Sequence, residues 1–162
     1  AMQSIMIALL LNTTMLLIAG LGCMIVGALM LNNLPMGAPP GFSRRLWAYL
    51  TRNVAETRRD HPFPELELPR APIAPGPLFT RLEHTLALLD WEIVEADPRD
   101  HRLHAVVETP LLRFKDDVVI RLEATRGGTE IHIRSSSRIG RGDLGANTRH
   151  ILDLLEMLGR QV

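Results

Sequence analysis

The chain has 162 residues, and its eighteen basic and eighteen acidic residues give a formal net charge of +0. This balance argues against general binding to nucleic acid, which depends on a surplus of positive charge. Cys23 is the only cysteine, so no disulfide can form within one chain, and cysteine usage does not indicate a redox compartment.

The stretch from Ile5 to Leu31 holds no charged residue and is longer than the roughly 20 apolar residues that cross a bilayer. A helix that is apolar on every face has no place in the core of so small a water-soluble chain. The stretch also lacks the basic start and the short apolar run of a signal peptide. The sequence therefore predicts a single transmembrane helix over residues 1–31.

Small residues recur on one face of this helix. Ala19, Cys23 and Gly27 are spaced four residues apart, and Gly20 lies beside them. Small side chains let two helix backbones approach closely in lipid. We expect these four residues to contact helices of other membrane-protein subunits, although glycine is also common in membrane helices generally.

Residues 32–52 are predicted to form a linker and a short amphipathic helix. Prolines and glycines in residues 32–41 end the first helix. Apolar residues then recur at helical spacing between Phe42 and Leu50. Tryptophan and tyrosine suit the headgroup zone, and arginine suits lipid phosphates. The hypothesis is an interfacial helix that contacts lipid headgroups through Phe42, Arg44, Arg45, Trp47 and Tyr49. The alternative is an ordinary helix of the domain.

Residues 53–162 are predicted to form a soluble α+β domain. Residues 53–76 contain five prolines and are expected to be an extended arm. Hydrophobic periodicity then predicts a helix, four strands and a last helix that Asp143 caps. The order α-β-β-β-β-α indicates a small antiparallel sheet with helices on one face. The expected bounds are 77–90, 91–96, 102–108, 117–124, 129–137 and 144–158.

The densest polar segment, residues 134–147, leads into the last predicted helix. Basic side chains beside the free N–H groups of a helix N-terminus can bind an anion. The candidate residues for such a site are Arg134, Arg138, Arg141 and Asn147. The alternative is a strand-to-helix connection in which turn and cap chemistry explain the same residues.

No catalytic or metal-binding constellation is predicted. His101 and His104 fall on opposite faces of an extended strand, and no tight group of ligands completes a metal site. Asp116 and Asp117 are adjacent, so a strand would point them in opposite directions, which argues against a catalytic carboxylate pair. The residues of a Ser-His-Asp triad come together only in the folded chain, so the sequence does not exclude such a triad. We expect no cofactor, no metal and no enzymatic activity.

Two segments resemble the domain of unknown function 1499 family of bacteria and plastids. They are Phe114–Leu122, which resembles its "F-x-D-D" strand, and Arg134–Asn147, which resembles its "RSRSRVGRGDLGxN" segment. The resemblance covers residues 53–158 and implies a fold, without an activity. Many relatives carry a cysteine-containing segment near the domain start, and the matching residues 51–57 here have no cysteine.

The charges around the predicted span favour one orientation. Arg44 and Arg45 follow it and no basic residue precedes it, so the positive-inside rule favours a cytoplasmic domain at a bacterial inner membrane. A periplasmic domain stays open. We expect a non-catalytic accessory or stabilising subunit of a larger inner-membrane complex, respiratory or photosynthetic. The alternative is a membrane-tethered domain that binds lipid or another anion in an apolar pocket between helices and sheet.

Overall fold

A computed structural model of the chain describes residues 2–110 and 113–160. The chain forms two compact units, Ala1–Asn33 and Leu34–Val162. We describe each unit by itself.

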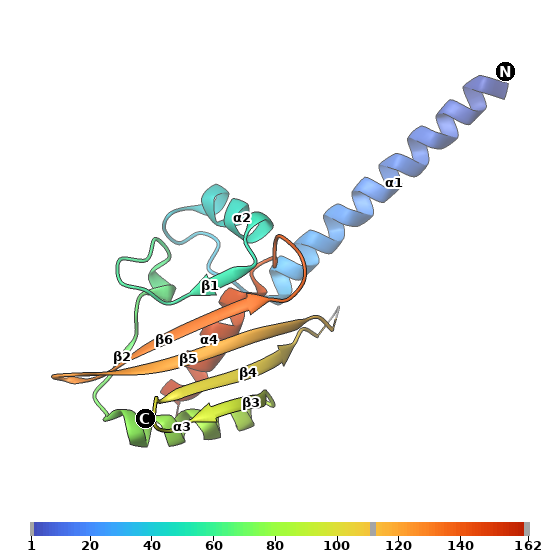
Figure 1. The fold of residues 1–162 in the computed structure, drawn as a ribbon. Coiled ribbons are helices and arrows are strands. Elements are labelled where there is room, and N and C mark those ends of the chain that lie inside the picture. The colour runs from blue at the N-terminus through green and yellow to red at the C-terminus, as the bar shows by residue number, and fades with distance from the viewer. Residues whose placement is uncertain (1, 111–112, 161–162) are drawn as a thin grey trace. The chain divides into compact units, whose positions relative to one another are not determined.

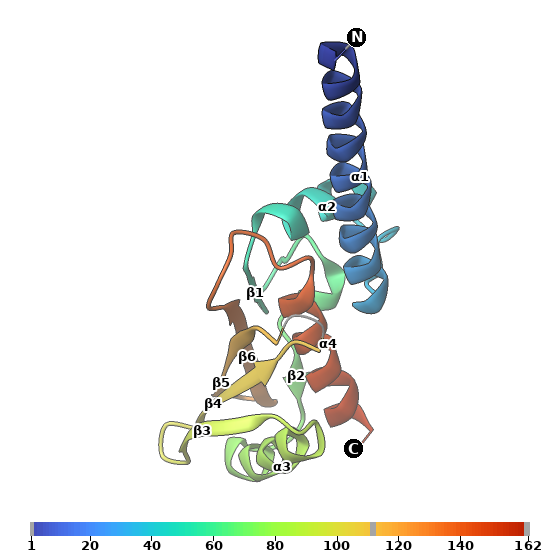
Figure 2. The ribbon, with the colours of Figure 1, turned by 90° about the vertical axis from the view of Figure 1, so that its right-hand side faces the viewer.

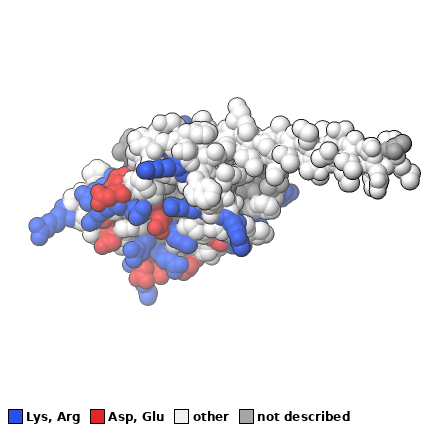
Figure 3. All heavy atoms as spheres, turned by 90° about the horizontal axis from the view of Figure 1, so that it is seen from above, with Lys and Arg blue, Asp and Glu red and all other residues white. Residues whose placement is uncertain are grey.

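The first unit is one helix, α1 (Met2–Leu31), which is 30 residues long. It carries no charged side chain, as its uniformly white surface in Figure 3 shows, and none of its residues is buried. Its most apolar window has a mean hydropathy of 2.3. At 1.5 Å per residue such a helix is about 45 Å long, more than the hydrocarbon core of a bilayer. Helix α1 is therefore long and apolar enough to cross a membrane.

The second unit is built on a six-stranded antiparallel sheet (Figure 1). The strands follow the order β1-β6-β5-β4-β3, and the short β2 also pairs with β6. Two helices, α3 (Pro75–Leu88) and α4 (Ala146–Gly159), cover the same face of the sheet (Figures 1 and 2). This arrangement confirms the predicted α+β class. The strands are β1 (Val54–Glu56), β2 (Arg70–Ala71), β3 (Glu92–Asp97), β4 (Arg102–Glu108), β5 (Lys115–Thr125) and β6 (Gly128–Ser137).

The core lies between this sheet face and the two helices. The register brings Leu103, Ile120 and Ile133 of three neighbouring strands side by side, and each is at most 1% exposed. Helix side chains cover them, since Leu82 and Leu86 of α3 are 0% exposed. Ile151 and Leu154 of α4 are equally buried. Leucine and isoleucine side chains therefore pack where the alternative hypothesis placed an apolar pocket, and ligand binding between helices and sheet stays a prediction.

The proline-rich arm holds structure that the sequence pattern does not reveal. Both β1 and β2 pair with β6, and a single turn of 3₁₀-helix, η1 (Pro64–Leu66), lies between them. A glycine makes the second pairing fit. Gly128 has φ 138°, and a Cβ there would lie 2.0 Å from the carbonyl oxygen of Ala71. The arm is therefore an edge of the sheet.

Candidate functional site

The small residues of α1 are open to contact. Ala19, Gly20 and Cys23 are exposed, and nothing lies within 4 Å of a Cβ built at Gly20 or Gly27. No described residue of the first unit therefore covers this face. That another helix packs there stays a prediction.

Helix α2 (Phe42–Thr51) has two faces of different character, and the structure corrects part of the predicted lipid contact. Arg45 is 0% and Tyr49 3% exposed, because both point into the second unit. Trp47, which is 70% exposed, lies on the opposite face with the exposed Arg44, and Phe42 is 59% exposed in the first turn of the helix. Only these three of the five predicted residues remain available to a lipid surface.

Arg45 is the centre of a buried network that joins three segments. Its guanidinium forms a bidentate ion pair with Glu65 of η1, with one Nη2–Oε2 distance of 2.9 Å. The same group donates to the carbonyls of Ala38 and Pro39 and lies 4.4 Å from the centre of the Phe63 ring. The hydrogen bond to Glu65 raises the pKa of Arg45 above its ordinary value. The arginine therefore holds α2 against the arm.

The start of α4 is satisfied from within the chain. Both carboxylate oxygens of Asp143 accept backbone N–H groups, from Gly145 at 2.8 Å and from Asn147 at 3.1 Å. Burial nevertheless raises the pKa of Asp143. The Asn147 side chain accepts from Ser135 and donates to Ser137 and to the carbonyl of Asn53. The predicted anion site at this helix N-terminus is wrong for Asn147, because the side chain is 0% exposed and fully bonded.

Arg138 is also committed to a partner within the chain. It donates two hydrogen bonds to Asp117, at 2.8 and 2.7 Å, and His104 lies 2.8 Å from the same carboxylate. The hydrogen bond from Arg138 lowers the pKa of Asp117 to about 2. The Asp117 carboxylate occupies Nε and Nη2 of Arg138 and balances its charge, so we do not assign Arg138 to an anion site. Arg141 is exposed, and Arg134 lines a cleft that is described below.

Asp116 and Asp117 lie on opposite faces of β5. Asp116 is 1% exposed and faces α4, where its Oδ2 lies 2.9 Å from Nε2 of His150. Its Oδ1 is buried without a hydrogen-bond partner among the described residues. The ring of Trp91 packs edge-on against that of His150. This pair joins α4 to the sheet, and both of its side chains are at most 9% exposed.

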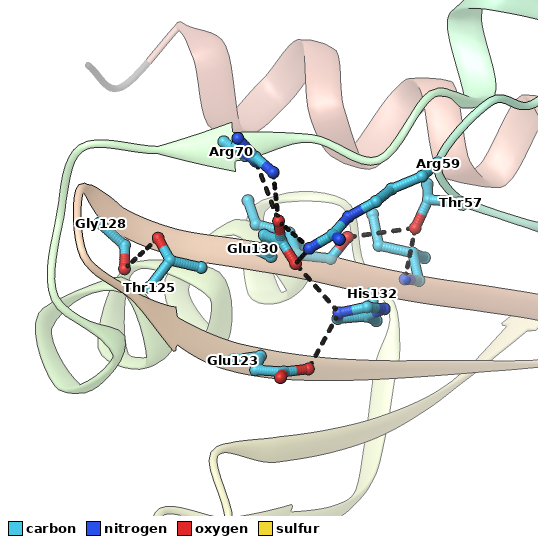
Figure 4. Close-up of polar contacts among 10 residues, drawn as sticks. Thr57, Arg59, Arg70, Glu123, Thr125, Gly128, Glu130 and His132 are labelled. Carbon is cyan, nitrogen blue, oxygen red and sulfur yellow. Dashed lines mark hydrogen bonds and ion pairs between the residues drawn. The ribbon is translucent and has the colours of Figure 1, made fainter.

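A second polar cluster fixes the arm to the sheet (Figure 4). Glu130 of β6 is 2% exposed and accepts hydrogen bonds from Arg59 at 2.7 and 2.8 Å and from Arg70 at 2.7 and 2.9 Å. The hydrogen bond from Arg59 lowers the pKa of Glu130. His132 lies beside the cluster, 3.4 Å from Glu123. In the part of the chain that the structure describes, no group of three potential ligands could hold a metal ion.

A cleft of about 260 Å³ lies within the second unit, where α2, β1 and the arm meet. Arg52, Arg58 and Arg134 line it together with apolar side chains. Sequence reasoning did not associate these arginines, because 76 residues separate Arg58 from Arg134 and only the β1–β6 pairing joins them. It also missed Glu65 and Glu130, whose partners lie at least 20 residues away. No local pattern marks any of these residues.

Comparisons with known proteins identify a family and little else. The family described as "Protein of unknown function (DUF1499)" matches residues 37–158, which is more than half of the chain. No curated protein matches at a significant level. One solved structure, described as "Crystal structure of Ara h 8.0201", is 14% identical with a TM-score of 0.44. The match covers 67% of this chain and 95% of that one, a likeness too weak to carry an argument.

Proposed function

Since the chain belongs to the DUF1499 family of unknown function, we propose a function from its own architecture: a non-catalytic accessory subunit of a larger membrane complex. In this proposal α1 crosses the inner membrane once and packs against helices of other subunits, while the second unit lies at the membrane surface. A respiratory or photosynthetic complex would be a suitable host.

The observation that carries the proposal is the composition and exposure of α1. A helix of 30 residues without a charge and without a buried residue leaves a large apolar surface that water does not tolerate. The lipid of a bilayer is sufficient to cover that surface, so the apolar composition by itself does not require a partner helix. The open stripe of Ala19, Gly20, Cys23 and Gly27 adds a face on which a second helix can approach closely. A cleaved signal sequence would share the apolar character, so the fate of α1 in the mature chain is part of the test.

Exposed side chains of α2 support a second contact. Phe42 and Trp47 are large, apolar and mostly exposed, and Arg44 is exposed on the same helix. Aromatic rings and arginine are the side chains that favour the headgroup region. We therefore assign Phe42, Arg44 and Trp47, without Arg45 and Tyr49, to a membrane surface.

The test is purification of the full chain from membranes of its source in a mild detergent, followed by mass spectrometry. We expect the intact chain, with α1 present, to elute with one defined set of membrane-protein subunits. Gly27→Leu places a bulky side chain in the stripe and should release those subunits. Leu21→Phe adds bulk on the opposite helix face and should retain them. A monomer that elutes alone, or a mature chain that lacks α1, would refute the proposal.

A further inference from the structure

The cleft within the second unit combines positive charge with an apolar wall. Arg52 follows α2, Arg58 follows β1 and Arg134 lies in β6, so three separate segments each contribute an arginine to the lining of one cleft. The apolar part of the lining comes from Ala48, Ala55 and Phe63. None of the three arginines forms an ion pair with a carboxylate in the described ranges. Arginines elsewhere in the unit, such as Arg45 and Arg138, do so.

The acidic side chains of the cleft do not fully cancel this charge. Asp143 also lines it and accepts backbone N–H groups at the start of α4 through both carboxylate oxygens, so its carboxylate offsets one of the three arginines. Glu56 lies across from Arg134 in the β1–β6 register, so three guanidinium groups meet two carboxylates and one positive charge is in excess. His61 adds no further charge near neutral pH, because burial lowers its pKa. A bound anion would therefore meet a net positive lining.

The edge of β1 supplies further donors. Asn53 and Thr57 form the hydrogen bonds to β6 at the two ends of the strand. Because hydrogen-bonded and non-bonded residues alternate in an antiparallel pair, Val54 and Glu56 point their backbone N–H and C=O groups away from β6. Both residues line the cleft. Backbone N–H groups beside arginines suit oxygen atoms of phosphate or carboxylate.

From this arrangement we propose that the cleft binds an anionic amphiphile, a molecule with a phosphate or carboxylate head and a short hydrocarbon part. Arg52, Arg58 and Arg134 would bind the head, and Ala48, Ala55 and Phe63 would contact the hydrocarbon. A volume of about 260 Å³ suits a small molecule or the end of a larger one. The head could belong to a membrane lipid or to a soluble metabolite, and both offer the same chemistry. The proposal does not depend on α1 having a partner helix.

The experiment uses the full chain in nanodiscs of phosphatidylcholine, with methyl NMR signals of alanine, valine and leucine as the readout. Hexyl phosphate is the probe. We expect saturable shifts at Ala48, Ala55 and Leu66, with a Kd at or below about 1 mM. Inorganic phosphate should bind at least roughly tenfold more weakly, since burial of two methylene groups alone is worth about that factor. Hexanol should leave these signals unchanged.

Variants locate the site. Arg58→Gln and Arg134→Gln should each weaken binding about tenfold, the value of one charge-assisted contact. Arg126→Gln, an exposed arginine in the β5–β6 turn, is the matched control and should bind as the parent does. All three side chains are exposed, so core methyl signals such as that of Leu103 should stay in place and report an intact fold.

A second arm separates the two sources of ligand. Nanodiscs that contain phosphatidic acid, without hexyl phosphate, should shift the same methyl signals if the head belongs to a membrane lipid. Shifts with hexyl phosphate alone would assign the cleft to a soluble ligand, and either result supports the proposal. Equal binding of hexanol and hexyl phosphate, equal weakening by Arg126→Gln, or no shift with any anion would overturn it.

Discussion

Replacement of Arg45 by alanine should destabilise the second unit more than any other single arginine substitution on α2. The side chain is 0% exposed, and its bidentate partner Glu65 is 15% exposed. Removal of the guanidinium leaves that carboxylate and the carbonyls of Ala38 and Pro39 without their donor. The contact of the guanidinium with the Phe63 ring is lost as well.

The magnitude follows from these contacts. Cutting one side of a buried ion pair costs about 3–5 kcal/mol, because an uncompensated charge stays behind. Partial access of water to Glu65 favours the lower end of that range. We therefore expect Arg45→Ala to lower the free energy of unfolding by about 3 kcal/mol. Arg45→Lys keeps a charge but not the bidentate geometry, so its free energy of unfolding should lie between those of Arg45→Ala and the parent chain.

Urea unfolding of the full chain in a nonionic detergent measures this effect. The chain has two tryptophans, so a Trp47→Phe background leaves Trp91, beside His150, as the only fluorescent reporter of the core. Arg44→Ala removes the exposed neighbour and is the matched control, with an expected change within about 0.5 kcal/mol. Equal midpoints for Arg44→Ala and Arg45→Ala would refute the view that Arg45 holds α2 against the arm.

Three further predictions follow from single contacts. Arg138→Ala should raise the pKa of Asp117 from about 2 toward its ordinary value of 3.8, as a carbon-13 NMR titration would detect. Because folding lowers that pKa, the ionised carboxylate stabilises the folded state above about pH 4, and this stabilisation is lost as the pH falls toward 2. If the parent chain and Arg138→Ala unfold in acid at the same pH, this account is contradicted. Gly128→Ala should increase hydrogen exchange at β2, because its Cβ would meet the Ala71 carbonyl, whereas Gly127→Ala has open space and should not. Brominated lipids should quench Trp47 and spare Trp91, and equal quenching of both would remove α2 from the membrane surface.

The sequence predicts the regular elements of the second unit well. Alternating apolar residues place β5 and β6, and the helical spacing of Leu78, Leu82 and Leu86 places α3. In each case one face is buried, so the periodicity of the sequence reflects the burial directly. The same physics explains why Asp116 and Asp117 diverge, since neighbours in a strand face opposite ways.

Long-range pairing explains what the sequence does not reveal. Strands β1 and β2 have three and two residues in a proline-rich segment and exist only because β6 offers an edge. In the sequence Arg45 has the pattern of a lipid-facing residue. Only the structure shows its ion pair with Glu65, which lies twenty residues later in the chain. The cleft arginines belong together only after β1 has paired with β6. None of these contacts has a local signature.

Site-specific photo-cross-linking in native membranes tests the proposed accessory role most directly, because it reports contacts of α1 in the intact bilayer. A benzophenone amino acid would replace Leu16, which by helical periodicity flanks the Ala19–Cys23–Gly27 stripe, or Ile25, which lies on the opposite face. We predict that position 16 cross-links to one defined membrane protein, while position 25 gives lipid adducts only. Lipid adducts alone at both positions would contradict the assignment of α1 as an assembly surface.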